Sequence, residues 1–479
     1  MNDQQWKYLF APESVAVIGA SNRTGSWGFG ILQNLLKSSG RLVYPINPKA
    51  KDILGVKAYA RVKDIPGPVD LAVIAVSASK VPDAFRDCAE KGVKTAVIVA
   101  GGFAETDGEG KQLEAELVDI AGRAGLRFVG PNTMGHADTT SQVNTLAWAS
   151  DVPQGPVGLI SQSGNFSTRI IETARGLGIG FSKVIVTGNE SDLHLEDYLA
   201  FFAGDDKTEV IMAYIEGLRD GRRFFRLAKN ITRHKPIVVI KSGGTDASAK
   251  AVMSHTGALA GSKAIYGAVF RQAGVIEVED DEELCGVTLG LLRQPLPRGK
   301  KVGIMAIGGG MGVMTTEACE RAGLEVPSIE AGTIEKLDEY LPPRWSRGNP
   351  VDMVGLSFAE TPLIYSCLWT LMADARVDAV LLLVPVPPPK KLLSRFFDAE
   401  EISAFKKTQE RNLRNVGQRV NQTGKPVFFI KSALELAREQ ETIALLRRMD
   451  IPAYPSPRQA AKALKHMVWY RRYLDHNSL

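Results

Sequence analysis

Three times along the sequence, a short apolar run ends in a small-residue or glycine-rich segment that is followed by a helical pattern. The apolar runs are residues 14–18, 156–160 and 302–307, and the segments after them begin at Gly19, Ser161 and Gly308. A strand, a tight turn and a helix in this order present backbone N–H groups and the positive end of a helix to an anion. The repetition therefore predicts an α/β protein with several anion-binding loops.

Further apolar runs between these starts predict strands that alternate with helices. Repeated strand–helix units favour parallel sheets whose two faces are covered by helices. A chain of 479 residues is too long for one core and is typical of about three domains. We expect a Rossmann-like domain at 1–143, followed by two flavodoxin-like domains at 144–293 and 294–479. A polar connection opens the second, and a proline-bearing linker opens the third.

Composition excludes several classes of protein. The net charge of +5 is too small to indicate a nucleic-acid binder, and no apolar run approaches the roughly 20 residues of a membrane helix. The N-terminus lacks the basic region and apolar core of a secretion signal. The four cysteines are far apart, without zinc-type spacing, which indicates reduced thiols, no metal site and a cytoplasmic protein.

The first glycine-rich turn argues against NAD. Ser21 and Thr24 stand where the dinucleotide fingerprint has glycines, and Lys49 follows the second predicted strand where an acidic residue would hold a ribose diol. A lysine there suits a phosphate, and CoA carries both a ribose 3′-phosphate and a pyrophosphate. An ordinary surface lysine at position 49 is an equally open alternative.

Two polar residues follow successive predicted strands of the second domain. Glu216 ends the run 210–215, and His255 lies among small residues in the segment after the run 236–240. A carboxylate beside an imidazole fixes its tautomer and stabilises its charged or phosphorylated form. Both residues also have simpler interpretations: His255 as a hydrogen-bonded loop histidine, and Glu216 as a helix cap or a salt-bridge partner.

Several motifs occur together in one order along the chain. They are SVAVIGAS, YPINPK, VDLAVIAV, AGGFAE, GPN, LISQSGN, GNESD, YIEG, KSGG and SHTGALAG. In these motifs the chain resembles the NDP-forming acyl-CoA synthetases from about residue 8 to its end. The most similar subgroup is the α subunit of ADP-forming acetyl-CoA synthetase, a relative of succinyl-CoA synthetase. SHTGALAG together with YIEG is the most specific part of this resemblance.

The resemblance implies roles for particular residues. His255 would carry the phosphoryl group, and Glu216 would stabilise the phosphohistidine. The implied CoA contacts are Ser21, Thr24, Gly25, Ser26, Trp27, Lys49, Ala100, Gly101, Gly102 and Asn132. The implied phosphate-binding residues are Ser163, Gly164, Asn165, Gly309, Gly310 and Met311. No metal ligand on this chain is implied.

The implied reaction is that of an acid–CoA ligase. ATP phosphorylates His255, the phosphoryl group passes to a small carboxylic acid, and CoA attacks the acyl phosphate. The chain has no ATP-grasp segment, so we expect a separate ATP-grasp β subunit that binds ATP or ADP with Mg²⁺, in an α2β2 hetero-oligomer.

Three departures from the family pattern leave the acid open. They are the run 133–136, Asn165 with Phe166 after the SQSG motif, and the GNESD form of its motif. Two other functions stay open as well. One is a non-catalytic CoA-binding regulatory protein of the same fold, which the intact His255 and Glu216 disfavour, and the other is an NAD-dependent oxidoreductase.

Overall fold

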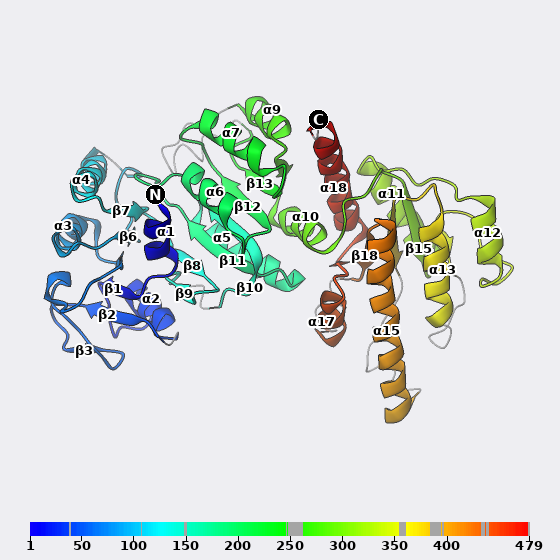
Figure 1. Cartoon of the computed structure of the whole chain (residues 1–479), viewed down its shortest axis with the longest axis horizontal. Coiled ribbons are helices and arrows are strands. Elements are labelled where there is room, and N and C mark those ends of the chain that lie inside the picture. The colour runs from blue at the N-terminus through cyan, green and yellow to red at the C-terminus, as the bar shows by residue number, and fades with distance from the viewer. Residues whose placement is uncertain are drawn as a thin grey trace. The chain divides into compact units, whose positions relative to one another are not determined.

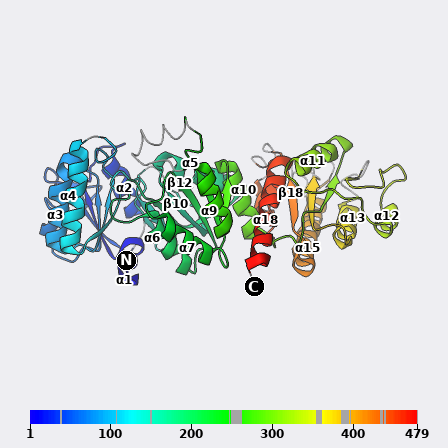
Figure 2. The same cartoon turned by 90° about the horizontal axis from the view of Figure 1, so that it is seen from above.

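The computed structural model describes residues 1–37, 40–106, 108–147, 151–245, 247, 262–353, 361–383, 394, 397–432, 436 and 440–477. The chain divides into two compact units, one made of residues 1–175 and 179–281 and the other of residues 176–178 and 282–479. Both units consist of parallel sheets with helices packed on them (Figures 1 and 2). Among the described residues, no helix is long and apolar enough to cross a membrane.

The first unit begins with a five-stranded parallel sheet in the order β2-β1-β5-β6-β7. Its strands are β1 (Ser14–Ile18), β2 (Leu42–Ile46), β5 (Leu71–Ile74), β6 (Thr95–Ile98) and β7 (Arg127–Val129). The helices between them are α2 (Trp27–Leu36), α3 (Val81–Lys91) and α4 (Gly108–Ala124), with 3-10 turns at Val62–Asp64 and Ala78–Lys80. A small hairpin, β3 (Asp52–Ile53) and β4 (Val56–Lys57), follows β2.

The second sheet of this unit has the order β14-β13-β12-β10-β11-β8-β9. Its parallel strands are β10 (Gln154–Ser161), β11 (Phe181–Val186), β12 (Val210–Ile215), β13 (Ile237–Lys241) and β14 (Ile276–Val278). Its helices include α5 (Gly164–Leu177), α6 (Leu195–Gly204), α7 (Gly221–Ile231) and α9 (Lys263–Ala273). Two short strands, β8 (His136–Asp138) and β9 (Val143–Asn144), extend the sheet in antiparallel fashion from β11. The sequence division at 143/144 falls inside β9, between Val143 and Asn144, and leaves β8 on the side of the first domain.

The second unit has one five-stranded parallel sheet in the order β16-β15-β17-β18-β19. Its strands are β15 (Val302–Ala306), β16 (Val351–Asp352), β17 (Ala379–Leu383), β18 (Val427–Ile430) and β19 (Ala453–Tyr454). Its helices include α10 (Asp281–Arg293), α11 (Gly309–Arg321), α12 (Ala331–Asp338), α13 (Thr361–Ala373), α15 (Ala399–Thr423), α17 (Gln440–Arg448) and α18 (Pro457–Asn477).

The parallel strands of all three sheets share one topology. Numbered within each sheet in chain order, they lie in the order 2-1-3-4-5. In such a sheet the connections after strand 1 and strand 3 leave toward opposite sides, which opens a crevice between them at the carboxyl edge. These switch points lie between β1 and β5, between β10 and β12, and between β15 and β17. The predicted α/β class with doubly wound parallel sheets is confirmed.

The N-terminal helix α1 (Asp3–Phe10) packs against the second sheet's layer, although it precedes the first sheet in the chain (Figure 1). The rings of Trp6 and Phe10 lie 4.7 and 4.8 Å from the ring of Phe201 in α6. The carbonyl oxygen of Leu9 lies 2.8 Å from Nε2 of His136 in β8. Burial lowers the pKa of His136 to about 4, so this imidazole is a neutral part of the core at pH 7.

A buried lysine, Lys183, forms ion pairs with two carboxylates of this layer. Nζ of Lys183 in β11 lies 2.9 Å from the Asp205 carboxylate and 3.4 Å from that of Asp138 in β8. The three side chains are between 6 and 11% exposed. The ammonium group also faces the rings of Phe10 and Phe201, at 5.9 and 5.6 Å from their centroids.

We expect Lys183→Met to destabilise the chain by about 3 to 5 kcal/mol, because it leaves two buried carboxylates without their cation. Urea unfolding at pH 7 measures the change. The matched control is Arg123→Met, which removes an exposed pair with Asp119 and should cost under about 1 kcal/mol. Equal effects of the two substitutions would contradict the assignment of Lys183 as a structural ion.

Candidate functional site

The turn after β1 brings two backbone segments into direct contact. A Cβ atom on Gly28 in α2 would lie only 2.0 Å from the carbonyl oxygen of Gly19, so no side chain fits there. Ser26 caps the helix, since its hydroxyl accepts a hydrogen bond from the N–H of Phe29 at 3.4 Å. This is the geometry that the glycine-rich sequence predicts for binding a phosphate.

The ten predicted CoA contacts all follow strands of the first sheet at its carboxyl edge. They come after β1 (Ser21, Thr24, Gly25, Ser26 and Trp27), after β2 (Lys49), after β6 (Ala100, Gly101 and Gly102) and after β7 (Asn132). Every one of them is exposed or half-buried, so all are accessible to a ligand. The loops also contact one another, as the N–H of Asn132 donates to the carbonyl of Ala100 at 2.8 Å.

The predicted phosphate-binding residues divide between the two units. Ser163, Gly164 and Asn165 lie at the start of α5, directly after β10. The hydroxyl of Ser161 fixes this turn by accepting from the N–H of Ser163 and donating to its carbonyl. Gly309, Gly310 and Met311 belong to the second unit, where they begin α11 after β15. There the N–H of Gly308 donates to the carboxylate of Asp352 at 3.1 Å.

Glu216 directly follows β12, and its backbone is held from two sides. The amide oxygen of Gln162 accepts from the N–H groups of Glu216 and Gly217, the second at 3.0 Å. The ammonium group of Lys241, at the end of β13, donates to the carbonyl of Glu216 at 2.9 Å. Glu216 itself is buried, with 5% of its surface exposed. His255, its predicted partner, lies outside the described residues.

Lys241 adds a cation to this corner of the sheet. Its Nζ lies 4.5 Å from the centroid of the Tyr266 ring, over the face of that ring. Burial lowers the pKa of Lys241, and the charge of Glu216 acts against that shift. The turn after β12 therefore has a positive group beside its buried carboxylate.

A second buried glutamate lies next to Gln162. The amide NH₂ of Gln162 donates to the carboxylate of Glu190 at 3.0 Å and to the carbonyl of Gly217 at 2.8 Å. Glu190 has a left-handed backbone, with a φ of 55°, and is 3% exposed. Burial raises its pKa to about 7, although the hydrogen bond from Gln162 acts against the shift.

The residue before Glu190 points to the first sheet instead. The amide of Asn189 donates to Glu105 at 2.6 Å and to Glu114 at 2.9 Å, and it accepts from Asn132 at 3.3 Å. Glu105 in turn accepts from the N–H of Gly102 at 2.6 Å. These contacts connect the predicted CoA loops to the second sheet.

These residues lie in motifs of the sequence, but the family resemblance implies no role for them. Gln162 lies in LISQSGN, Asn189 and Glu190 in GNESD, and Glu105 in AGGFAE. Polar residues placed directly after predicted strands were the available signal. Which side chain meets which is decided by tertiary contacts over 28 to 84 positions, and no local pattern reports them.

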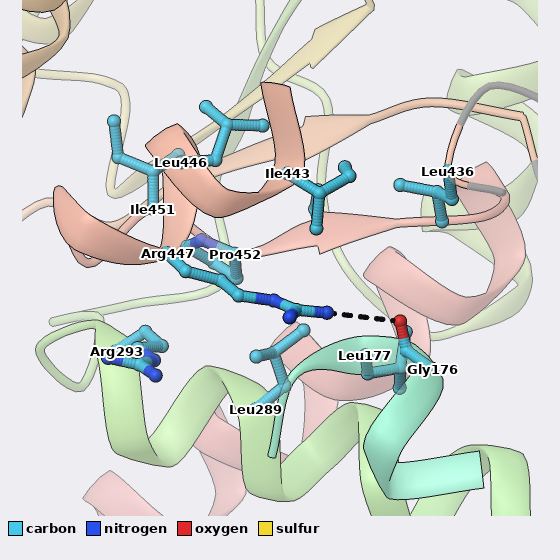
Figure 3. A pocket seen from close by; sticks show the side chains of 11 residues that line it. Gly176, Leu177, Leu289, Arg293, Leu436, Ile443, Leu446, Arg447, Ile451 and Pro452 are labelled. Carbon is cyan, nitrogen blue, oxygen red and sulfur yellow. Dashed lines mark hydrogen bonds between the residues drawn. The ribbon is translucent and has the colours of Figure 1, made fainter. Parts of the chain in front are cut away.

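A small cavity in the second unit offers no room for a ligand. Its volume is about 10 Å³, enough for roughly one water molecule, and its walls include Leu289, Ile443 and Leu446 (Figure 3). The guanidinium of Arg447 crosses it to the carbonyl of Gly176, at 3.3 Å. Within the described part of the chain, no cluster of three or more His, Cys, Asp or Glu side chains is suited to a metal ion.

Comparison with known families assigns the two sheets of the first unit. The family described as "CoA binding domain" matches residues 13–138, and the family described as "Succinyl-CoA ligase like flavodoxin domain" matches residues 154–290. The second match holds β10 to β14 and Glu216.

Individual relatives cover nearly the whole chain. It is 37% identical over 461 residues to the "Acetate--CoA ligase [ADP-forming] II subunit alpha" of Pyrococcus furiosus, covering 96% of this chain and 97% of that protein. It is 38% identical over 351 residues to a 4-hydroxybutyrate–CoA ligase [ADP-forming] of Nitrosopumilus maritimus, covering 72% of this chain and 50% of that protein.

A solved structure agrees with these relatives. The dinucleotide-forming acetyl-coenzyme A synthetase 1 of Ca. Korarchaeum cryptofilum, in complex with phosphate and ADP, superposes with a TM-score of 0.83 at 31% identity, over the full length of both chains. The chain therefore belongs to the NDP-forming acyl-CoA synthetase family, as its motifs predicted.

Proposed function

We propose that this chain is the α subunit of an ADP-forming acid–CoA ligase, with CoA bound at the first sheet and a phosphohistidine at the second. The observation that carries the proposal is the direct junction of the two carboxyl edges. The N–H of Asn189 donates to the carbonyl of Pro131 at 2.9 Å, and the N–H of Ser191 donates to that of Gly130 at 3.2 Å. The loop after β7 thus lies against the loop after β11, and Glu190 of that second loop contacts Gln162, which binds the Glu216 turn.

The proposed reaction has three steps. First, Nε2 or Nδ1 of His255 attacks the γ-phosphorus of ATP, and ADP leaves. Second, a carboxylate oxygen of the acid attacks the phosphohistidine, giving an acyl phosphate and restoring the imidazole. Third, the CoA thiolate attacks the acyl carbon; a C–S bond forms, the C–O bond breaks, and phosphate leaves.

The described residues supply electrostatic stabilisation for these steps. The N–H groups at the start of α5, at Gly164 and Asn165, would hold the travelling phosphoryl group. Glu216 would accept a hydrogen bond from the imidazole and stabilise its phosphorylated form. In the second unit, the start of α11 at Gly309–Met311 would offer a second phosphate site.

The same proposal includes a partner subunit and a division of the chain into domains. The relative in Pyrococcus furiosus is named an α subunit. We propose a separate ATP-grasp β subunit that binds the nucleotide with Mg²⁺, an α2β2 assembly, a cytoplasmic location, and the domains 1–143, 144–293 and 294–479. No part in nucleic-acid binding is assigned to the chain.

The acid is proposed only as a small carboxylic acid. Relatives are named for acetate and for 4-hydroxybutyrate, so the family itself admits more than one acid. Near the start of α5, Met134 lies against Gly164, where a Cβ atom would be 2.6 Å from Met134 Cγ. The ring of Phe166 lies 4.6 Å from that of Tyr214. These side chains are the candidates for choosing between acids.

Phosphoryl transfer to His255 is tested with ³²P-labelled ATP and the co-expressed β subunit. We expect an acid-labile, base-stable label on the chain that His255→Ala abolishes and that a cognate acid removes. Glu216→Gln should lower the labelled fraction about tenfold or more, because it removes the negative charge beside the imidazole. A chain that binds CoA but takes no label with its partner would instead be the regulatory protein of the same fold.

CoA binding is tested by calorimetric titration of the chain alone. We expect CoA to bind and NAD not to bind. Lys49→Ala should weaken CoA binding about tenfold while leaving 3′-dephospho-CoA unchanged, because the lost contact is to the 3′-phosphate. Lys51→Ala, at another exposed lysine of the same loop, is the control. Equal weakening for both ligands would make Lys49 a surface lysine, and tight NAD binding would revive the oxidoreductase.

A further inference from the structure

We infer that Glu190 is a positioning residue of the phosphohistidine site, which acts through Gln162 to fix the turn that carries Glu216. The inference rests on the proposed function for the role of Glu216, but its geometric part stands on the structure alone. No family match or relative assigns a role to Glu190.

The first step is the Gln162 side chain, whose amide makes four hydrogen bonds. Its oxygen accepts from the N–H groups of Glu216 and Gly217, and its NH₂ donates to Gly217 and Glu190. This uses both amide hydrogens and both lone pairs, so the amide has a single satisfactory orientation. Turning it over would aim NH₂ at two backbone N–H groups.

The second step is Glu190, which makes one of these four bonds and has two costly features. Its backbone lies in the left-handed region, which glycine adopts far more readily than glutamate. Its carboxyl group is buried, which disfavours the ionised form. With this backbone, the Glu190 side chain contacts Gln162. The side chain of Asn189, one residue earlier, contacts Glu105 after β6 and Glu114 in α4.

The charged and titratable groups around Glu190 come from α6, from its own loop, from β7 and from the turn after β12. Glu196 of α6 raises its pKa, and the Tyr198 hydroxyl of the same helix also feels its charge. Asp192 lies in the same loop and is paired with Arg127. Arg219, after β12, donates to the carbonyl of the preceding Asn189 at 2.8 Å. Burial beside Glu196 lets Glu190 change charge close to neutral pH.

Consecutive residues of one loop therefore contact the two halves of the site. Asn189 meets the loop of Gly102 through Glu105, and Glu190 meets the Glu216 turn through Gln162. A shift of this loop would move both the CoA edge and the phosphohistidine glutamate.

The geometric part is tested by hydrogen–deuterium exchange of the chain. Glu190→Ala should speed exchange of the Glu216 and Gly217 amides about tenfold, because Gln162 loses the group that orients it. Glu190→Gln should leave them protected, since its amide oxygen still accepts from Gln162. Glu209→Gln, at an exposed glutamate before β12, is the control. Unchanged exchange in Glu190→Ala would overturn the inference.

The functional part is tested with the chain and its β subunit. Glu190→Ala should lower His255 labelling by ATP about tenfold while CoA affinity stays within twofold. At pH 6, Glu190→Gln should be labelled to the same extent as the wild type, unlike Glu190→Ala. The ratio of wild-type to Glu190→Gln labelling should then rise toward pH 8, because only the ionised carboxylate strengthens its bond to Gln162.

The outcomes separate the two proposals. Absence of label on the wild-type chain, with faster exchange in Glu190→Ala, would end the proposed function and leave the positioning of the turn. Normal labelling in Glu190→Ala, or an equal loss of labelling and CoA affinity, would overturn the positioning role.

Stability gives an independent readout of the buried carboxyl group. Its pKa in the folded chain is about 7, above the ordinary 4.5, so the unfolded chain ionises first as the pH rises. The free energy of unfolding of the wild type therefore decreases as the pH rises from about 4.5 to 7, and that of Glu190→Gln lacks this decrease. We expect Glu190→Gln to raise the melting temperature at pH 8 and to leave it unchanged at pH 4.5. A higher melting temperature at pH 4.5 alone would show that the carboxyl is not buried in this way.

Discussion

Hydrogen bonding between parallel strands is the constraint on which the rest of the first unit depends. Because its strands run in one direction, each sheet collects its loops at one carboxyl edge, and the order 2-1-3-4-5 opens a crevice there. Residues as distant as Ser21 and Asn132 thereby share one edge, and so do Gly164 and Glu216 at the second sheet.

Local pattern predicted much of this architecture. The runs at 14–18 and 210–215 are strands with those same bounds, β1 and β12. These elements are apolar or amphipathic and end at turn residues, so local sequence suffices to find them. The strands β8 and β9 were not predicted, because they have only three and two residues. Their place in the sheet depends on the pairing of β8 with β11, which is distant in the sequence, and β9 then pairs with β8.

The candidate site was predictable in its residue types but not in its connections. Polar residues after strands pointed to Glu216, Ser163 and Lys49, since such positions meet at a sheet edge. The hydrogen bonds from the turn after β12 to the amide oxygen of Gln162 join residues that are 54 and 55 positions apart. Glu190 also has a left-handed backbone, which the sequence does not predict because position 190 is not a glycine. Physical coupling of this kind is visible only once the chain is folded.

The N-terminal helix has a consequence for how such proteins can be recombined. Trp6, Leu9 and Phe10 precede the first sheet in the chain, yet they fill the layer around Phe201 and His136 of the second. The CoA-binding half is therefore not a cassette that can be exchanged between relatives by a single crossover near position 143. Because α1 also contacts β6 of the first sheet, the opening ten residues of a chimaera would have to fit both parents at once.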